Sequence, residues 1–228
     1  MAFGVNEDFC YPFAPFKVSE VRRDENTNQL SITAYDALYA ATRYTVADLK
    51  LNAPYTLHQF ATSCASLLGL PLQIIGVNDG SFDLDFPDGA NFDGTESIRE
   101  ALNDVAEATQ TIYYVDGEYR LTFKRLDISG EPVVEITKHK YFDLESKTNR
   151  RLTGVGNATE LGDNVGAELA QSGTTQYVRD NAFWALREDI AELVNKALAA
   201  VGGLTINQFE TNWRGNFLVE IGDRLAIE

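Results

Sequence analysis

The segment Leu30–Asp36 restricts the fold more than any other feature, because its hydrophobic period changes without an intervening loop. Apolar and polar residues alternate along Leu-Ser-Ile-Thr-Ala-Tyr, which is typical of a half-buried strand. Directly after Asp36, the sequence Ala37-Leu38-Tyr39 begins a helix-like pattern. A strand that runs straight into a helix places this part of the chain in a mixed architecture.

The same strand is expected to form a hairpin with the residues before it. Residues 16–21 form a second strand candidate, and the polar cluster at 22–28 between the two candidates suits a turn. Because a hairpin alone is marginally stable in water, we expect it to belong to a larger sheet.

Two amphipathic helices are expected in the first half of the chain. Apolar residues at helical spacing predict the first over Thr56–Leu68, with Thr56 as its N-cap and Gly69 as its C-terminal stop. The second is expected over 95–109, and its N-cap stays open. Three residues suit that position: Ser97, which has the spacing of a capping box to Glu100, Asp93 and Thr95.

The remaining pattern predicts strands, one loop and a third helix. The strands are expected at 72–77, 111–115, 118–123, 133–137, 151–156, 204–209 and 217–227. Asp116-Gly117 suits a type I′ hairpin turn, and the glycine-rich segment 160–175 reads as a loop. The longest helix is expected over 179–201, where Gly202-Gly203 ends it.

The expected strands and helices are interspersed without the regular βαβ alternation of a doubly wound sheet, which favours an α+β fold. Composition supports a folded protein and excludes several classes of function. The chain has 228 residues, of which 44% are hydrophobic, so it can bury a real core. Its net charge of -15 argues against tight binding to nucleic acid, which depends on cationic side chains. No apolar run approaches the roughly 20 residues of a membrane span, so neither membrane insertion nor secretion is expected.

An acidic stretch at 78–96 is the best sequence candidate for a site, and calcium binding there stays open. Its carboxylates occur without one Lys or Arg: Asp79, Asp83, Asp85, Asp88, Asp93 and Glu96. The EF-hand spacing is not met, so a solvated loop is favoured over a metal site. The same carboxylates lack the defined pairing that glycosidase chemistry requires. We therefore expect no catalytic, cofactor-binding or metal-binding residues.

Other reactive or aromatic residues are interpreted mainly as structural. Cys10 and Cys64 are expected to be buried thiols rather than a disulfide, and both histidines, His58 and His139, are expected to face solvent. Gly154-Val-Gly156 reads as a strand irregularity, and Asn157-Ala-Thr159 as a chance glycosylation match. Four aromatic residues are candidates for sugar stacking or for an interface anchor: Tyr113, Tyr114, Trp213 and Trp184.

The order of these motifs resembles tail-tip and baseplate hub proteins of tailed bacteriophages. In that family a strand ending in Ala-Tyr-Asp leads into a small α/β domain, as at 34–36, and a helix and a hairpin follow. Trp213-Arg-Gly-Asn216 and Glu220-Ile-Gly-Asp223 resemble the turns that lead into a late barrel strand. The resemblance covers nearly the whole chain.

The resemblance implies a three-part organisation and a symmetric assembly. Residues 1–35 would be closing strands of a first tube-like β-barrel, 36–145 an α/β hub domain, and 146–228 the start of a second barrel with the helix 179–201. Family members are trimers that continue the hexameric tail tube, so a homotrimer of the full-length protein is expected. Sequence before Met1 and after Glu228 is also expected, which would make this chain a fragment.

The function implied is structural rather than enzymatic. The chain would link the tail tube to the distal tip in the virion and contact other tail proteins, namely the tube, distal tail, tape-measure and fibre or spike proteins. An acidic channel would let DNA pass without adhesion. The alternatives are a platform for a tail-associated cell-wall hydrolase and a carbohydrate-binding adhesin.

Overall fold

The computed structural model divides the chain into two compact units. It describes residues 2–3, 11–12, 16–24, 29–126, 131–137, 141–158, 164–168, 175–185, 187–201, 205–213, 219 and 221–227. Unit 1 comprises 1–87, 92–103 and 112–124, and unit 2 comprises 88–91, 104–111 and 125–228. Helix α2 (Ile98–Thr109) therefore contributes its first half to unit 1 and its second half to unit 2.

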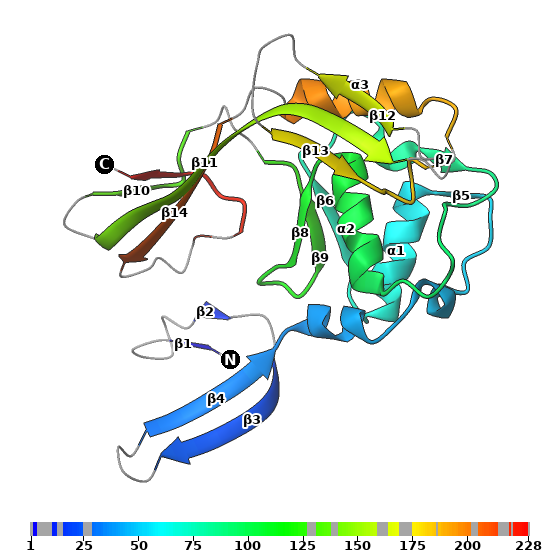
Figure 1. Ribbon diagram of the computed structural model, residues 1–228. Helices are drawn as coiled ribbons and strands as arrows, with labels where there is room; N and C mark the ends of the chain where they lie inside the picture. The colour runs from blue at the N-terminus through cyan, green and yellow to red at the C-terminus, as the bar shows by residue number, and fades with distance from the viewer. Residues whose placement is uncertain are drawn as a thin grey trace. The chain divides into compact units, whose positions relative to one another are not determined.

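Unit 1 is built on a three-stranded sheet with β9 (Leu121–Lys124) in the centre, β6 (Leu72–Ile75) parallel to it on one edge and β8 (Ile112–Val115) antiparallel on the other. Figure 1 shows α1 (Leu57–Leu67) and α2 on the same side of this sheet. Leu121 and Phe123 of the central strand are fully buried, so this strand lies in the core of unit 1. The elements of unit 1 besides α2 are β1 (Ala2–Phe3), β2 (Tyr11–Pro12), β3 (Lys17–Asp24), β4 (Gln29–Tyr35), η2 (Ala37–Thr42), η3 (Val46–Leu49), β5 (Tyr55–Thr56), α1 (Leu57–Leu67), β6 (Leu72–Ile75), η4 (Ser81–Asp83), β7 (Asp85–Phe86), β8 (Ile112–Val115) and β9 (Leu121–Lys124).

Helix α1 begins and ends where the sequence predicts. The Thr56 hydroxyl accepts a hydrogen bond from the Gln59 backbone N–H at 3.1 Å, and the Gln59 side chain accepts one from the Thr56 N–H at 2.8 Å. Gly69 follows the helix with φ +72°, and the Leu70 N–H donates to the Ala65 carbonyl. This left-handed residue terminates the helix at low cost because glycine has no Cβ.

Of the three candidate caps for α2, Ser97 is the one used. Its backbone N–H donates to Glu100 Oε2 at 2.8 Å, and its hydroxyl accepts from the Glu100 N–H at 3.2 Å. The helix therefore begins at Ile98 rather than at residue 95. Asp93 instead accepts hydrogen bonds from the backbone and hydroxyl of Thr95, so it stabilises the turn before the cap.

The hairpin between β8 and β9 is confirmed, but its predicted type I′ turn is wrong. Such a turn requires positive φ at both central residues, and Gly117 does not have it, whereas Tyr119 does, at +63°. The turn is organised by Asp116, whose Oδ1 accepts the backbone N–H groups of Glu118 and Arg120, both at 3.0 Å. Its Oδ2 accepts Arg120 Nε and the Thr122 hydroxyl.

The hairpin of β3 and β4 has one polar and one apolar face. The two strands pair antiparallel, with a bulge between Val18 and Glu20. Because side chains alternate along a strand, the pairs on the apolar face are Val18–Ala34, Val21–Ile32 and Arg23–Leu30, and those on the polar face are Glu20–Thr33, Arg22–Ser31 and Asp24–Gln29. Every residue of β3 is exposed, and Figure 1 shows the hairpin as an arm that extends away from α1.

Unit 2 is organised by one long strand, β11 (Tyr141–Ala158). Its first part pairs antiparallel with β14 (Thr205–Trp213), and its second part pairs with β12 (Asn164–Glu168) and β13 (Thr175–Arg179) on opposite edges. A register shift between Leu152 and Gly154 confirms the predicted strand irregularity. Separately, β10 (Val134–Ile136) pairs parallel with β15 (Leu225–Ile227).

Several predictions for this half need correction. The segment 160–175, interpreted as a loop, contains β12, because β11 offers it a backbone edge to pair with. Of the last predicted strand, 217–227, only β15 is a strand among the described residues. Residues 214–218 lie outside the described part. No sheet in the described residues closes into a barrel, and the fold is α+β as predicted. The three-part division 1–35, 36–145 and 146–228 stays a prediction.

The predicted helix 179–201 is wrong in its first half, since α3 spans only Ile190–Val201. The predicted start at residue 179 instead belongs to a strand, because Thr175–Arg179 pairs with β11. Asn181 follows this strand in a turn: its backbone N–H donates to Asn157 Oδ1 at 2.8 Å, its side-chain Nδ2 donates to the Asp104 carbonyl at 3.0 Å, and its Oδ1 accepts the Phe183 N–H. These bonds hold Asn181 itself outside a helix.

Replacing Asp116 by Asn should lower the stability of unit 1 by about 2–3 kcal/mol at neutral pH, because two donors lose a charged acceptor. Burial alone would raise the pKa of the Asp116 carboxyl, but the hydrogen bonds from Arg120 and Thr122 hold it below its usual value. The stabilisation is therefore present above about pH 4, the unfolded-state pKa, and is lost as pH falls through the folded-state pKa.

Urea unfolding at several pH values measures this effect. The difference between wild type and Asp116→Asn should be constant above about pH 4 and should shrink below it. Glu118→Gln is the matched control, because Glu118 pairs with the same Arg120 from an exposed position, and it should change stability by less than about 0.5 kcal/mol. A difference that grows in acid would contradict this role for Asp116.

Replacing Asn181 by Ala should destabilise unit 2 by about 2–3 kcal/mol, because the Asp104 carbonyl and the Phe183 N–H lose their buried partner. The measurement is urea unfolding followed by tryptophan fluorescence, since Trp184 is buried in the same unit. Asn195→Ala is the control: Asn195 is an exposed residue of α3, and this change should be within about 0.5 kcal/mol. Equal effects of the two variants would refute the importance of the network.

Candidate binding pocket at the base of the β3–β4 hairpin

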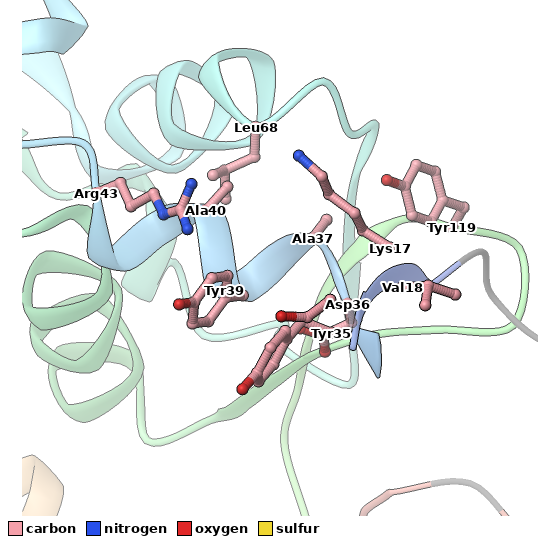
Figure 2. Close-up of a pocket in the computed structure, with 11 residues that line it drawn as sticks. Lys17, Val18, Tyr35, Asp36, Ala37, Tyr39, Ala40, Arg43, Leu68 and Tyr119 are labelled. Carbon is pink, nitrogen blue, oxygen red and sulfur yellow. The ribbon is translucent and has the colours of Figure 1, made fainter. Parts of the chain in front are cut away.

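A pocket of about 270 Å³ lies where the hairpin meets η2, entirely within unit 1. Its lining comes from the first residues of β3, the end of β4, η2, the end of α1 and the β8–β9 turn. Figure 2 shows Lys17 and Tyr119 toward one end of the pocket and Tyr39 and Arg43 toward the other. The Ala34-Tyr35-Asp36 motif that carries the sequence resemblance therefore forms part of this pocket.

Three side chains spaced four residues apart form a stack beside the pocket. The rings of Tyr35 and Tyr39 are nearly parallel, with centroids 4.2 Å apart and an interplanar angle of 15°. The Arg43 guanidinium carbon lies 4.9 Å from the Tyr39 centroid, in cation–π geometry. Figure 2 shows Tyr39 between Arg43 and Tyr35. Leu38 and Ala41 are buried, which keeps the stack on the outer side of η2.

The pocket holds two cations and one carboxylate that do not neutralise one another. Lys17 faces Tyr35 across the hairpin register, and Asp36 occupies the N-cap position of η2 without a side-chain capping bond. Within the described ranges, neither Lys17, Arg43 nor Asp36 has an ion-pair partner. These groups are therefore available to a ligand as donors and as an acceptor.

Tyr119 reaches the pocket from a strained backbone position. Its φ of +63° places a bulky residue in the left-handed region, which costs roughly 1–2 kcal/mol. The hydrogen bonds that Asp116 accepts from the neighbouring N–H groups offset this cost. Backbone strain that the surrounding structure maintains tends to occur at functional positions.

The acidic stretch 78–96 does not converge on one point. Asp79 accepts hydrogen bonds from the backbone and hydroxyl of Ser81, and Glu96 accepts the N–H groups of Asp93 and Gly94. Hydrogen bonds from Thr95 lower the pKa of Asp93. Asp83, Asp85 and Asp88 are exposed. Among the described residues, no group of three or more His, Cys, Asp or Glu side chains is arranged to hold a metal ion.

Cys64 is a core residue, as its position on the apolar face of α1 predicts. It is fully buried, and burial raises the pKa of its thiol to about 12. The thiolate that nucleophilic chemistry requires is therefore negligible near neutral pH. His58 is exposed, as predicted, whereas Cys10 and His139 lie outside the described residues.

The aromatic residues singled out from the sequence are not at the pocket. Tyr114 is buried, and Tyr113 donates its hydroxyl to Asn103 Oδ1 at 2.8 Å while its ring contacts Phe123. The interpretation of Trp184 as an interface anchor is wrong, because its side chain is only 5% exposed within unit 2. The side chain of Trp213 lies outside the described part.

Asn157 is fully buried, so the glycosylation match is not an accessible acceptor. The sequence did not predict a pocket at Tyr35, Tyr39 and Arg43. Tyr35 ends β4, Tyr39 lies in the 3₁₀-helix η2 and Arg43 caps it, so their stacking follows from the strand-to-helix junction rather than from a helical repeat. The contributions of Lys17 and Tyr119 depend on tertiary contacts that no local pattern reveals.

None of the helices in the described ranges combines the length and apolar character of a membrane-crossing segment. No protein-family model matches the chain, and no curated protein matches it. Solved structures do match the chain, and they resemble it in fold at low sequence identity.

Two tail proteins have similar structures. The tail protein of Neisseria meningitidis MC58 superposes with a TM-score of 0.53 at 13% identity, over 81% of this chain and 58% of its own. The 43 kDa tail protein of prophage MuSo2 from Shewanella oneidensis gives a TM-score of 0.54 at 13% identity, over 92% of this chain and 66% of its own. The chain thus spans about three fifths of the length of these proteins. It has the fold of these tail proteins, and the resemblance predicted from the sequence is confirmed at the level of the fold.

Proposed function

We propose that this chain is a structural component of a bacteriophage tail, placed in the tail-tip or baseplate hub, where it connects the tail tube to the distal tip. Two things support the proposal: the fold shared with tail proteins, one of them from a prophage, and the uncovered apolar face of the β3–β4 hairpin. The virion is the corresponding location.

The exposed apolar face of the β3–β4 hairpin is the observation that supports the proposal most directly. Val21 is 58% exposed and Leu30 is 60% exposed, although both lie on the apolar face. In the described part of the chain, β3 and β4 pair only with each other, so each keeps an unpaired backbone edge. A long apolar hairpin with free edges is a template for pairing with another chain.

An assembly of subunits would use this arm. We propose that it completes a sheet with neighbouring copies in a homotrimer of the full-length protein, and that adjoining surfaces contact the tube, distal tail, tape-measure and fibre or spike proteins. The net charge of -15 supports a channel that does not hold DNA, since carboxylates repel phosphates.

Ile32→Glu should weaken self-association of the purified chain by at least about tenfold in dissociation constant, because a carboxylate would have to be buried against apolar side chains. Sedimentation velocity over a range of micromolar concentrations measures the effect. Ile32 is 50% exposed, so the thermal midpoint of the monomer should change little.

Ser31→Glu provides the matched control. Ser31 directly precedes Ile32 in β4, but its side chain lies on the polar face, opposite Arg22. It should leave self-association unchanged. A wild-type chain that stays monomeric throughout, or equal effects of the two variants, would contradict the assembly role. Degradation of peptidoglycan that Asp83→Ala or Asp85→Ala abolishes would favour the hydrolase platform instead.

A further inference from the structure

We propose that the pocket lined by Lys17, Tyr35, Asp36, Arg43 and Tyr119 binds a saccharide that carries a carboxylate, of the uronic-acid type. The proposal goes beyond the assembly role and does not depend on it, since the pocket lies within one copy of unit 1. Four properties of the pocket support it, namely its aromatic rings, its cations, its carboxylate and its strained tyrosine.

One aromatic ring face suits the apolar face of a sugar. Tyr39 is covered by Tyr35 on one face and by Arg43 on the other, so the outer face of Tyr35, which is 38% exposed, is the one available to a ligand. The stack and the cation–π contact with Arg43 hold both rings in place before a ligand arrives, which reduces the entropy lost on binding. Tyrosine offers an apolar ring face together with a hydroxyl that can hydrogen-bond, as sugar recognition requires.

The two cations suit a carboxylate. The chain has 19 Lys and Arg against 34 Asp and Glu, so carboxylates outnumber the cations that could pair with them. Lys17 and Arg43 nevertheless have no ion-pair partner in the described ranges, and both line the pocket. Arg43 lies over Tyr39, so its planar guanidinium is oriented before binding and its N–H groups can donate to a carboxylate.

Asp36 distinguishes an acidic saccharide from an acidic peptide. An ionised carboxylate only accepts hydrogen bonds, so it favours a ligand that brings hydroxyl donors. It also repels a ligand whose groups are all anionic, such as a run of glutamates. A uronic acid offers both hydroxyl donors and a single carboxylate, and it therefore matches the mixed charges of the pocket.

Tyr119 provides a further argument, because a smaller residue would serve the turn better. Glycine or asparagine adopts positive φ more readily than tyrosine does. The chain nevertheless places a phenol there, and that phenol lines the pocket (Figure 2). The geometry is consistent with a side chain kept for contact with a ligand at the expense of local backbone stability.

The test is a titration of the full chain with D-glucuronic acid at low ionic strength, followed by saturation-transfer NMR. Saturable binding with a millimolar dissociation constant is expected, and D-glucose should bind at least about fivefold more weakly because it lacks the carboxylate. A tetraglutamate peptide tests the acidic-peptide alternative. Absence of saturable binding up to about 50 mM, or tighter binding of the peptide or of glucose, would overturn the proposal.

Variants connect binding to the pocket. Lys17→Met and Arg43→Met should each weaken glucuronate binding by about five- to tenfold, whereas Arg99→Met, which removes an exposed cation of α2 outside the pocket, should have no effect. Tyr119→Gly should weaken binding without lowering the thermal midpoint, since it relieves the positive φ. Unchanged binding in both cation variants would overturn the assignment. The oligomeric state is measured separately, so failure of sugar binding leaves the assembly proposal unaffected.

Discussion

The buried residue Asn181 is the constraint on which the second unit depends. Its backbone N–H donates to Asn157 of β11, and its side-chain amide donates to the Asp104 carbonyl in the second half of α2 and accepts the N–H of Phe183 in its own turn. Each bond is buried, so breaking one leaves a polar group without water. The network connects the second half of α2 to β11 and to the turn after β13, all of which belong to unit 2.

Unit 1 has a core that does not use its hairpin arm. Leu121 and Phe123 of the central strand are fully buried, and Phe60 of α1 and Leu102 in the first half of α2 are buried as well. The arm formed by β3 and β4 contributes only exposed or half-buried residues, so its apolar face is free for intermolecular contacts. The surface that we propose for assembly is therefore separate from the folding core, and the pocket lies where the arm meets η2.

Capping and periodicity predicted the regular elements because these signals are local. Thr56 and Ser97 cap α1 and α2 through residues three positions away, and Gly69 ends α1 through its own backbone freedom. The turn at Asp116 could not be assigned correctly, because a carboxylate that accepts four hydrogen bonds outweighs the preference of glycine for positive φ. The pocket was missed because Lys17 and Tyr119 are distant in sequence.

The sequence by itself determined the α+β class, both ends of α1, the two hairpins and the tail-protein resemblance, since each depends on residue spacing over a few turns or on the order of such motifs. Tertiary structure alone decided where the third helix begins, that the segment after β11 contains a strand, and which aromatic residues stay exposed. These outcomes depend on buried polar groups and backbone edges finding partners, and such partners are supplied by residues far away along the chain.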